Sequence, residues 1–419
     1  MKNRTIGLIV ERFSNGGVEK VVTYLIPMFR AMGFRVVALT DEPAGDNEYC
    51  VEGEFLRVVI GRPGKNRCQI IEQSVRRLGI DVIVDHEYYL SPDDLRADLH
   101  AAQLAGAKFV VHHHNVFSER LLRDRQEHFF SSVLGVYNAA DALIVLSRVN
   151  YAYFKAMGCR PYYIPNPVPE VETKNERVRN GNTIVWIGRF TQTKQPLEAV
   201  KIFSFVKQRR PQAVLHMFGS YDCDRESRQI ATEIRHIINQ SEELKQSVFL
   251  NGFNLNVIEN LRRADILLLT SMFEGNPGVV IEAKACGVPV ACYDLPYVES
   301  IRDRAGIVVL NQENKSIAAD QIAEVLQDNQ KWTSLSKTAR LSYERMHACD
   351  LKQKYTEFFD ALKGGVEQKS ISAAEDIQIA LATLSDHTAY AVRHIRTIPY
   401  LFRCLRRSAA IFLLRILHR

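Results

Sequence analysis

The sequence predicts an α/β protein with two doubly wound domains. Short apolar runs of strand length alternate with longer helical segments along both halves of the chain. Glycine turns and charged residues directly follow several of these runs, where the carboxyl edge of a parallel sheet would lie. The 419 residues are also enough for two domains with full cores.

The composition is that of an ordinary globular protein, with 46% hydrophobic and 24% charged residues. The first apolar run, residues 6–10, is too short for a signal peptide and is expected to be a strand. No stretch approaches the roughly 20 apolar residues that span a bilayer. The eight cysteines form no C-x2-C pair, which favours reduced thiols in the cytoplasm over disulfides or zinc.

The domain boundaries follow from changes in composition. We expect a first domain at 1–168, a polar linker at 169–182 and a second domain at 183–349, then a helix at 350–363 and a tail at 366–419. In the first domain, strands are expected at 5–10, 35–40, 56–60, 81–85, 108–112, 142–146 and 162–164. In the second domain they are expected at 184–187, before Gly219, and at 248–253, 266–269 and 288–292.

The most informative stretch runs from residue 264 to 293. Its apolar run 266–269 has the pattern of a strand buried on both faces. Asn276 at the N-cap and Pro277 at the first helical position then predict a helix start, and Gly287 predicts its end.

The start of this helix is expected to bind an anion. The N–H groups of Gly278, Val279 and Val280 would be unpaired and would point out of the carboxyl edge of the sheet. Two carboxylates flank this point, Glu274 before the helix and Glu282 within it, and both suit the hydroxyl groups of a polyol. By themselves the two glutamates could equally be solvated helix residues.

A pair of cations is predicted at a second strand end. Arg189 follows the strand 184–187 and Gly188, and Lys194 stands five residues further on. Two cations at a carboxyl edge would stabilise the charge of a departing diphosphate. Taken alone, they could be solvated surface residues.

Two features of the first domain also fall at strand ends. Gly16 and Gly17 form a turn that lets a ligand approach the backbone, although plain turn chemistry is the more frequent meaning of such a pair. The residues 112–114 are three histidines after an apolar strand. Consecutive side chains alternate faces, so these three are not expected to form a zinc site. The D-x-D at 222–224 is interpreted as a chance match, so no metal is predicted.

The segment FEGNPGVVIEAKACGVPVA, residues 273–291, resembles the signature of glycosyltransferase family 4. This resemblance implies the GT-B fold, with two Rossmann-like domains, and covers roughly residues 5 to 363. It implies that Glu274 contacts the donor sugar, that Glu282 contacts the nucleotide ribose, and that Arg189 and Lys194 bind the diphosphate. The donor would lie along the backbone of the adjoining loop and helix start, which is Gly275, Asn276, Pro277, Gly278 and Val279.

The resemblance also assigns residues of the first domain. Gly16 and Gly17 match a G-G-x-E element that lines the donor phosphate, and a functional histidine is expected at His114, with His113 as the alternative. The helix 350–363 would cross back to the first domain. Leu295 and Pro296 replace a commoner glycine pair, which weakens the prediction of donor contacts there.

The net charge of +6 comes from the last part of the tail. Residues 389–419 contain seven arginines and no acidic residue, which leaves 47 basic and 48 acidic residues elsewhere. The arginines alternate with aliphatic residues, a pattern typical of a helix lying on an anionic membrane, although a helix packed on the body or a partner would look similar. Too few aromatic residues are present for binding of nucleic acid.

The resemblance implies a retaining, metal-independent hexosyltransferase with no cofactor besides its nucleotide-diphosphate sugar. The acceptor would be a lipid-linked saccharide or a cell-envelope polymer, and the enzyme would lie on the inner face of the cell membrane. Two alternatives are another GT-B enzyme, such as a sugar-nucleotide epimerase or a phosphorylase, and a non-catalytic, membrane-associated partner subunit.

Overall fold

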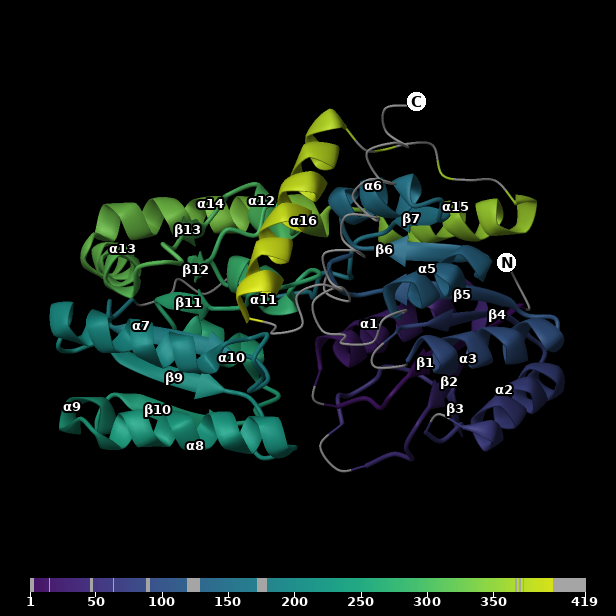
Figure 1. The fold of residues 1–419 in the computed structure, drawn as a ribbon, viewed down its shortest axis with the longest axis horizontal. Helices are drawn as coiled ribbons and strands as arrows, with labels where there is room; N and C mark the ends of the chain where they lie inside the picture. The colour runs from purple at the N-terminus through teal and green to yellow at the C-terminus, as the bar shows by residue number, and fades with distance from the viewer. Residues whose placement is uncertain are drawn as a thin grey trace. The chain divides into compact units, whose positions relative to one another are not determined.

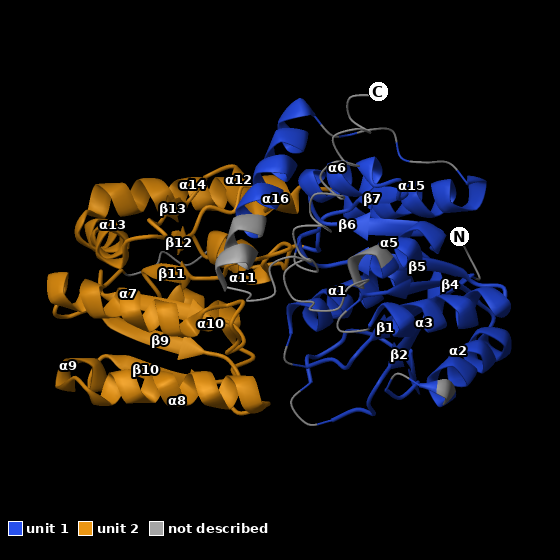
Figure 2. Ribbon diagram, viewed as in Figure 1, with its two compact units in different colours: residues 1–167, 350–419 blue, residues 168–349 orange. Residues whose placement is uncertain are grey.

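The structure is a computed structural model that describes residues 4–14, 16–45, 48–62, 64–87, 91–118, 129–171, 179–365, 368, 371 and 373–394. The chain divides into two compact units (Figure 2). Unit 1 comprises residues 1–167 and 350–419, and unit 2 comprises residues 168–349.

Unit 1 contains a parallel sheet with strand order β3-β2-β1-β4-β5-β6-β7 within its described residues (Figure 1). The strands are β1 (Arg4–Val10), β2 (Phe34–Thr40), β3 (Leu56–Val59), β4 (Ile80–Asp85), β5 (Lys108–His113), β6 (Ala142–Val145) and β7 (Pro161–Tyr163). The helices are α1 (Gly17–Ala31), α2 (Lys65–Leu78), α3 (Pro92–Leu104), α5 (Phe129–Ala139), α6 (Arg148–Ala156), α15 (Leu351–Gly364) and α16 (Ala374–His394).

Unit 2 contains a second parallel sheet, with strand order β10-β9-β8-β11-β12-β13 within its described residues. The strands are β8 (Thr183–Ile187), β9 (Val214–Phe218), β10 (Val248–Gly252), β11 (Ile266–Leu269), β12 (Val290–Cys292) and β13 (Ile307–Val309). The helices are α7 (Pro196–Arg209), α8 (Arg225–Asn239), α9 (Glu242–Lys245), α10 (Val257–Arg262), α11 (Gly278–Ala285), α12 (Glu299–Arg302), α13 (Lys315–Gln327) and α14 (Asn329–His347).

The predicted α/β class is confirmed, and the predicted strands are observed with ends that shift by at most two residues. The central apolar runs form strands that are buried along their length, as in β6 and β11, whereas the edge strands β3 and β10 are partly exposed. In β1, for example, every residue after Arg4 is buried, and β1 pairs in register with both β2 and β4.

The helix α15 belongs to unit 1, although it follows unit 2 in the sequence. Its aromatic stripe is buried in the core of unit 1, where Tyr355 packs edge-on against Phe29 and Phe359 packs against Phe34, each with ring centroids 4.9 Å apart. Large buried aromatic side chains dominate the energetics of a core. The described chain therefore completes the core of unit 1 with a segment beyond residue 349.

The predicted tail begins with a helix that packs on unit 1. α16 lies against α6, and its residues Ala380 and Leu384 are buried. The Ser118 hydroxyl lies 2.5 Å from His387 Nδ1 and links α16 to the segment after β5. The side chains of residues 388–394 and all of 395–419 lie outside the described residues, and with them the basic segment expected to bind a membrane.

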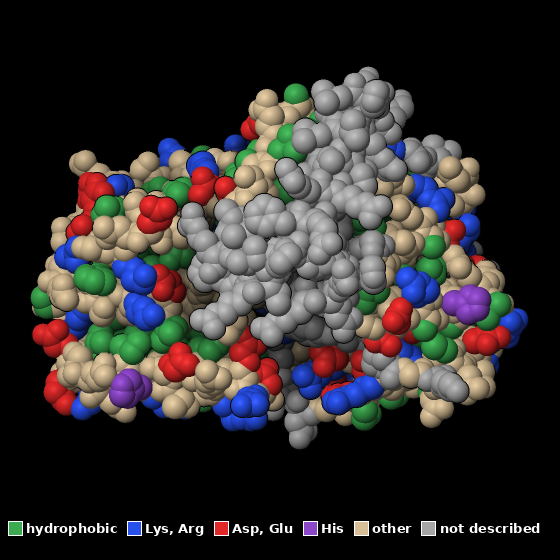
Figure 3. Space-filling model, viewed as in Figure 1, with side chains coloured by type: hydrophobic (Ala, Val, Ile, Leu, Met, Phe, Trp, Pro, Cys, Tyr) green, Lys and Arg blue, Asp and Glu red, His purple; other side chains and the backbone are tan. Residues whose placement is uncertain are grey.

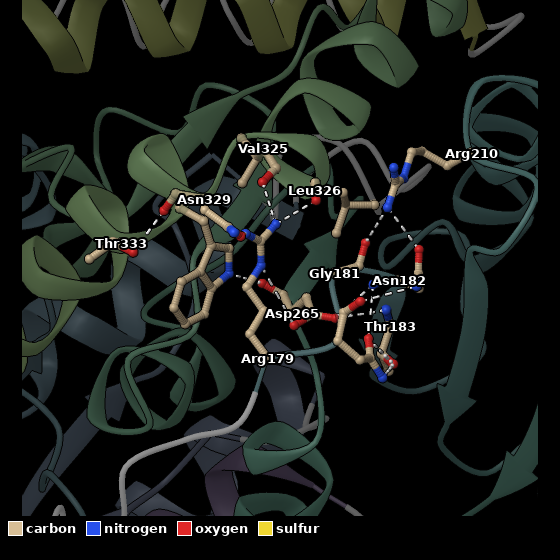
Figure 4. A network of polar contacts seen from close by, with 12 residues as sticks. Arg179, Gly181, Asn182, Thr183, Arg210, Asp265, Val325, Leu326, Asn329 and Thr333 are labelled. Carbon is tan, nitrogen blue, oxygen red and sulfur yellow. Dashed lines mark hydrogen bonds and ion pairs between the residues drawn. The ribbon is translucent and has the colours of Figure 1, made fainter.

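A polar network fixes the start of unit 2 at the amino end of its sheet (Figure 4). The Asp265 carboxylate accepts hydrogen bonds from the N–H groups of Asn182 and Thr183, each 2.9 Å long. The Arg179 guanidinium stacks over the Trp332 ring, 5.2 Å from its centroid, and burial lowers the pKa of Arg179. The last residues of the predicted linker are thus held by unit 2, while its residues 172–178 lie outside the described residues.

On the face drawn in Figure 3, lysine and arginine side chains are interspersed with aspartate and glutamate. Within the described residues, we find no helix that is both long and apolar enough to cross a membrane.

Candidate active site

The strand order places a ligand site of unit 2 between β8 and β11. β8 pairs with β9 on one side and with β11 on the other. The strands β9 and β10 therefore extend the sheet to one side of β8, and β11, β12 and β13 extend it to the other side. Ligands of open α/β sheets bind at such switch points, outside the carboxyl ends of the strands. The loops that follow β8 and β11 are the ones that carry the residues predicted to bind the donor.

These two loops are joined by hydrogen bonds. The Met272 N–H donates to the Thr193 carbonyl over 2.9 Å. The Thr270 hydroxyl lies 3.0 Å from the Lys194 carbonyl and also accepts a hydrogen bond from the Trp186 indole N–H over 3.1 Å. The Trp186 side chain is buried, so the contact between the loops is anchored in the core of unit 2.

The structure brings Lys194 and Glu274 together as an ion pair. The Lys194 ammonium lies 2.6 Å from Glu274 Oε1 and 2.8 Å from Oε2. The Glu274 side chain is 6% exposed, whereas that of Lys194 is 26% exposed. A buried carboxylate needs such a partner, because desolvation without compensation is costly. The ammonium has a third N–H group and reaches solvent, so it can serve a ligand as well.

Arg189 lies in the same loop and is exposed, as expected for a residue that meets a ligand at the edge of the sheet. Beside Arg189, the backbone of Gly188 and the backbone of Gly219 approach each other closely. A Cβ atom on Gly219 would lie 1.8 Å from the Gly188 carbonyl oxygen, so no larger residue fits at position 219. The φ angle of Gly219, +150°, also falls in the region that favours glycine.

The start of α11 differs in detail from the prediction. Asn276 is not the N-cap; the cap is Pro277, without a side-chain hydrogen bond, and the helix begins at Gly278. The Val280 N–H, expected to be unpaired, donates to the Pro277 carbonyl over 3.0 Å, because the first turn tightens onto the proline. The N–H groups of Gly278 and Val279 have no partner inside the helix, and Gly278 is exposed.

The other predicted donor residues of unit 2 lie around this helix start. Gly275 is buried in the loop between Glu274 and Pro277, and Glu282 is buried one turn inside α11, with 5% of its surface exposed. Asp224 of the D-x-D caps α8, where its carboxylate accepts a hydrogen bond from the Ser227 N–H over 2.7 Å.

In unit 1 the corresponding switch point lies between β1 and β4. Gly16 and Gly17 are placed there at the start of α1, with Gly16 as an extended N-cap residue. A Cβ atom on Gly16 would lie 1.8 Å from Glu19 Oε2, so the buried Glu19 carboxylate rests against the glycine. A carboxylate in the first turn stabilises a helix N-terminus, and a phosphate approaching this point would meet its negative charge.

The three consecutive histidines divide between two environments. His113 is 1% exposed and lies with its Nδ1 2.9 Å from Glu87 Oε2 and 3.2 Å from the Tyr137 hydroxyl. His114 is 7% exposed and lies with its Nε2 3.0 Å from His86 Nδ1. The expectation that the run cannot converge on one point is therefore confirmed.

The segment after β4 is a part of this site that the sequence analysis missed. His86 and Glu87 directly follow β4, and the His86 N–H donates to the Ile9 carbonyl over 3.1 Å. Glu87 has a φ angle of 39°, which is rare for a residue other than glycine. Such strain is concentrated at functional sites. His86 and Glu87, the polar residues directly after the predicted strand 81–85, were the signal in the sequence that could have indicated this part of the site.

Two doubly wound units, each built on a parallel sheet, are the architecture of the GT-B class. The family described as "Glycosyl transferases group 1" matches residues 168–342, and "Glycosyltransferase Family 4" matches residues 15–171. The chain belongs to the group 1 glycosyltransferases of the family 4 type.

Individual relatives agree with this assignment. The chain is 31% identical over 157 residues to the poly(glycerol-phosphate) alpha-glucosyltransferase of Bacillus subtilis, a match covering 37% of the chain and 22% of the relative. It is 28% identical over 110 residues to the N,N'-diacetylbacillosaminyl-diphospho-undecaprenol alpha-1,3-N-acetylgalactosaminyltransferase of Campylobacter jejuni, covering 26% and 29%. The matches thus span less than a third of either relative.

Among solved structures, Anabaena HepE in complex with UDP and glucose has the same fold. Its TM-score is 0.67 at 15% identity, with 85% of this chain and 99% of that chain covered.

Proposed function

We propose that the chain transfers a hexose-type sugar from a nucleotide-diphosphate sugar to a saccharide or lipid-linked acceptor of the cell envelope, with retention of the anomeric configuration and without a metal in the donor site. The Lys194–Glu274 pair carries this proposal. The pair supports it because the Lys194 ammonium lies within 2.6 Å of the Glu274 carboxylate, the group that would bind the sugar, at the switch point of unit 2.

The charges around this pair suit a departing diphosphate. When the bond between the sugar C1 and the phosphate oxygen breaks, negative charge develops on the leaving group. Arg189, the Lys194 ammonium and the N–H groups of Gly278 and Val279 are the positive groups at this edge of the sheet. Fixed positive groups stabilise such charge most where little water competes. These groups would do so without a divalent cation.

The carboxylates would hold the two sugars of the donor. Glu274, which is paired with Lys194, would accept hydrogen bonds from the hydroxyls of the transferred sugar, and Glu282 would accept them from the ribose. His114 of unit 1 would contribute a further contact to the transferred sugar. A new bond forms between C1 and the acceptor oxygen, and the acceptor proton passes to the leaving phosphate. The bonds broken and formed, and the proton transferred, are then all accounted for by the donor and the acceptor.

The relatives support the class of donor and acceptor. The names of the two curated relatives specify a glycerol-phosphate polymer and a diphospho-undecaprenol saccharide. HepE was crystallised with UDP and glucose. A uridine-diphosphate sugar and an envelope acceptor are therefore the first to test.

The test is a thermal-shift screen of the full chain against nucleotide diphosphates and nucleotide-sugars. We expect one base to raise Tm, and the shift to be lost in Arg189→Ala and kept in Arg263→Ala, an exposed arginine of the same unit. The matching nucleotide-sugar is then incubated with acceptors, and NMR of the product determines its anomeric configuration. Inversion would exclude retention. Consumption of donor without an acceptor would favour an epimerase or a hydrolase, and no shift would favour a non-catalytic partner.

The proposal includes binding of residues 389–419 to the inner face of the cell membrane. Because α16 packs on unit 1, a chain ending at residue 394 tests this better than one ending at Gly365. We expect the full chain to co-sediment with anionic vesicles, and the shortened chain to stay in the supernatant. Equal sedimentation of both would mean that the basic segment is not the anchor.

A further inference from the structure

Three buried histidines meet at the carboxyl edge of unit 1. His86 follows β4, and His112 and His114 come from β5 and the residue after it. β4 and β5 are neighbours in the sheet, with Asp85 paired to Val111, so His86 comes next to His112. His112 and His114 are two positions apart and share one face of the strand, while His113 points to the other.

The three rings are close enough to share one ion. Their ligand nitrogens all lie within 4.8 Å of one another, and His86 Nδ1 is 3.0 Å from His114 Nε2. The rings of His112 and His114 have centroids 4.1 Å apart. A tetrahedral zinc ion with bonds of 2.0–2.1 Å places its nitrogen ligands about 3.3 Å apart. Because 4.8 Å is an upper bound, the largest of these separations would have to shorten by at most about 1.5 Å, which rotation of the side chains can provide.

The histidines have unused ligand atoms. His86 Nε2 and both ring nitrogens of His112 are buried and have no hydrogen-bond partner among the described residues. Buried polar atoms normally find a partner, so three such atoms in one cluster require an explanation. Burial also lowers the pKa of His86 to about 3 and holds the pKa of His112 and His114 well below the usual value. The rings are therefore neutral, the form that binds metals.

We propose that His86, His112 and His114 bind one first-row transition-metal dication of the zinc type and leave a fourth position open. Imidazole nitrogens suit zinc, copper and nickel, whereas magnesium and calcium require oxygen ligands. The cluster is the one group of three such side chains found within the described residues. It is distinct from the Lys194–Glu274 pair of unit 2. Metal binding and the sugar contact proposed for His114 are alternative states of that side chain.

The test is a titration of the full chain, purified without a histidine tag, with Co²⁺ as a spectroscopic substitute for zinc. We expect one Co²⁺ per chain, with the visible d–d absorption of a tetrahedral site. His86→Gln and His112→Gln should each abolish this absorption. His100→Gln, which removes an exposed histidine of α3, should retain it.

Absence of the visible absorption in the wild type, or its persistence in both cluster variants, would overturn the proposal. Sulfur-to-metal charge-transfer absorption would assign binding to cysteine instead and also overturn it. Because a cluster variant could fail to fold, zinc X-ray absorption on the wild type provides a check that needs no substitution. A shell of nitrogen or oxygen at about 2.0 Å with imidazole scattering supports the site, and a sulfur shell at about 2.3 Å contradicts it.

Discussion

The two units have the same doubly wound topology but differ in the charge of the side chains at their switch points. In unit 2 the site between β8 and β11 is ionic, because Lys194 pairs with Glu274 and Arg189 is exposed nearby. In unit 1 the histidines beside the site between β1 and β4 are buried and have lowered pKa values. Topology places polar residues at the edge of a sheet, whereas the choice of residue decides whether that edge holds a charged ligand or a neutral one.

This contrast suggests that the two units bind different kinds of ligand. A cationic edge suits a diphosphate, while buried neutral imidazoles suit hydroxyl groups or a metal ion. The predictions below test each side of the comparison, from the largest expected effect to the smallest.

Glu274→Gln should lower the transfer rate about 100-fold or more, because it removes the charge that orients the sugar and pairs with Lys194. Binding of the nucleotide diphosphate should be retained, since Glu274 is assigned to the sugar. Transfer is followed by product formation and binding by calorimetry. Glu259→Gln, an exposed glutamate of the same unit, is the control. If Glu274→Gln transferred the sugar at the wild-type rate, Glu274 would not be a residue of the active site.

Arg189→Ala should weaken the binding of the nucleotide diphosphate about 10-fold, the size expected for one charge-assisted contact to a phosphate. Isothermal calorimetry measures the Kd, and Arg263→Ala should leave it unchanged. Equal Kd values for Arg189→Ala and the wild type would show that the cationic edge does not include Arg189.

Unit 1 should lose stability in acid, in part through His387. Burial lowers the pKa of His387 to about 4, from 6.5. Between these values the unfolded chain binds a proton that the folded chain excludes, so stability falls as the pH falls, by up to about 1.4 kcal/mol per pH unit. His387→Gln should make this slope shallower in urea unfolding at several pH values, and His100→Gln should not. An unchanged slope in His387→Gln would contradict the burial of this ring.

Removal of metal should have the smallest effect on catalysis. If the ionic edge of unit 2 supplies all the charge that the diphosphate needs, EDTA will not lower the transfer rate. Added zinc should instead inhibit by binding His114, and EDTA should reverse the inhibition. Loss of transfer in EDTA, restored by a divalent cation, would mean that transfer requires a metal.

Much of unit 2 could be predicted from sequence because its site consists of contiguous motifs. Residues 266–269 were placed correctly as a strand, and Glu274 and Lys194 were both singled out. The predictions that were wrong concern the first turn of α11. The sequence favoured Asn276 as the cap, whereas the first turn closed on Pro277 and took up the Val280 N–H.

The site of unit 1 was less accessible to sequence reasoning. The alternation of faces in the run 112–114 was predicted, but the contribution of His86 was not. Nothing near residue 86 indicates that β4 lies beside β5, because strand order depends on how all the helices and strands pack together.

The sequence by itself determined the α/β class, the strands and the segment 273–291 that resembles the family signature, because these depend on local periodicity and on residues close together in the chain. Only the tertiary structure decided that Lys194 forms an ion pair with Glu274, that His86 joins His112 and His114, and that α16 packs on unit 1. Each of these contacts joins residues distant in sequence. Burial and strand adjacency, which create them, are properties of the folded chain as a whole.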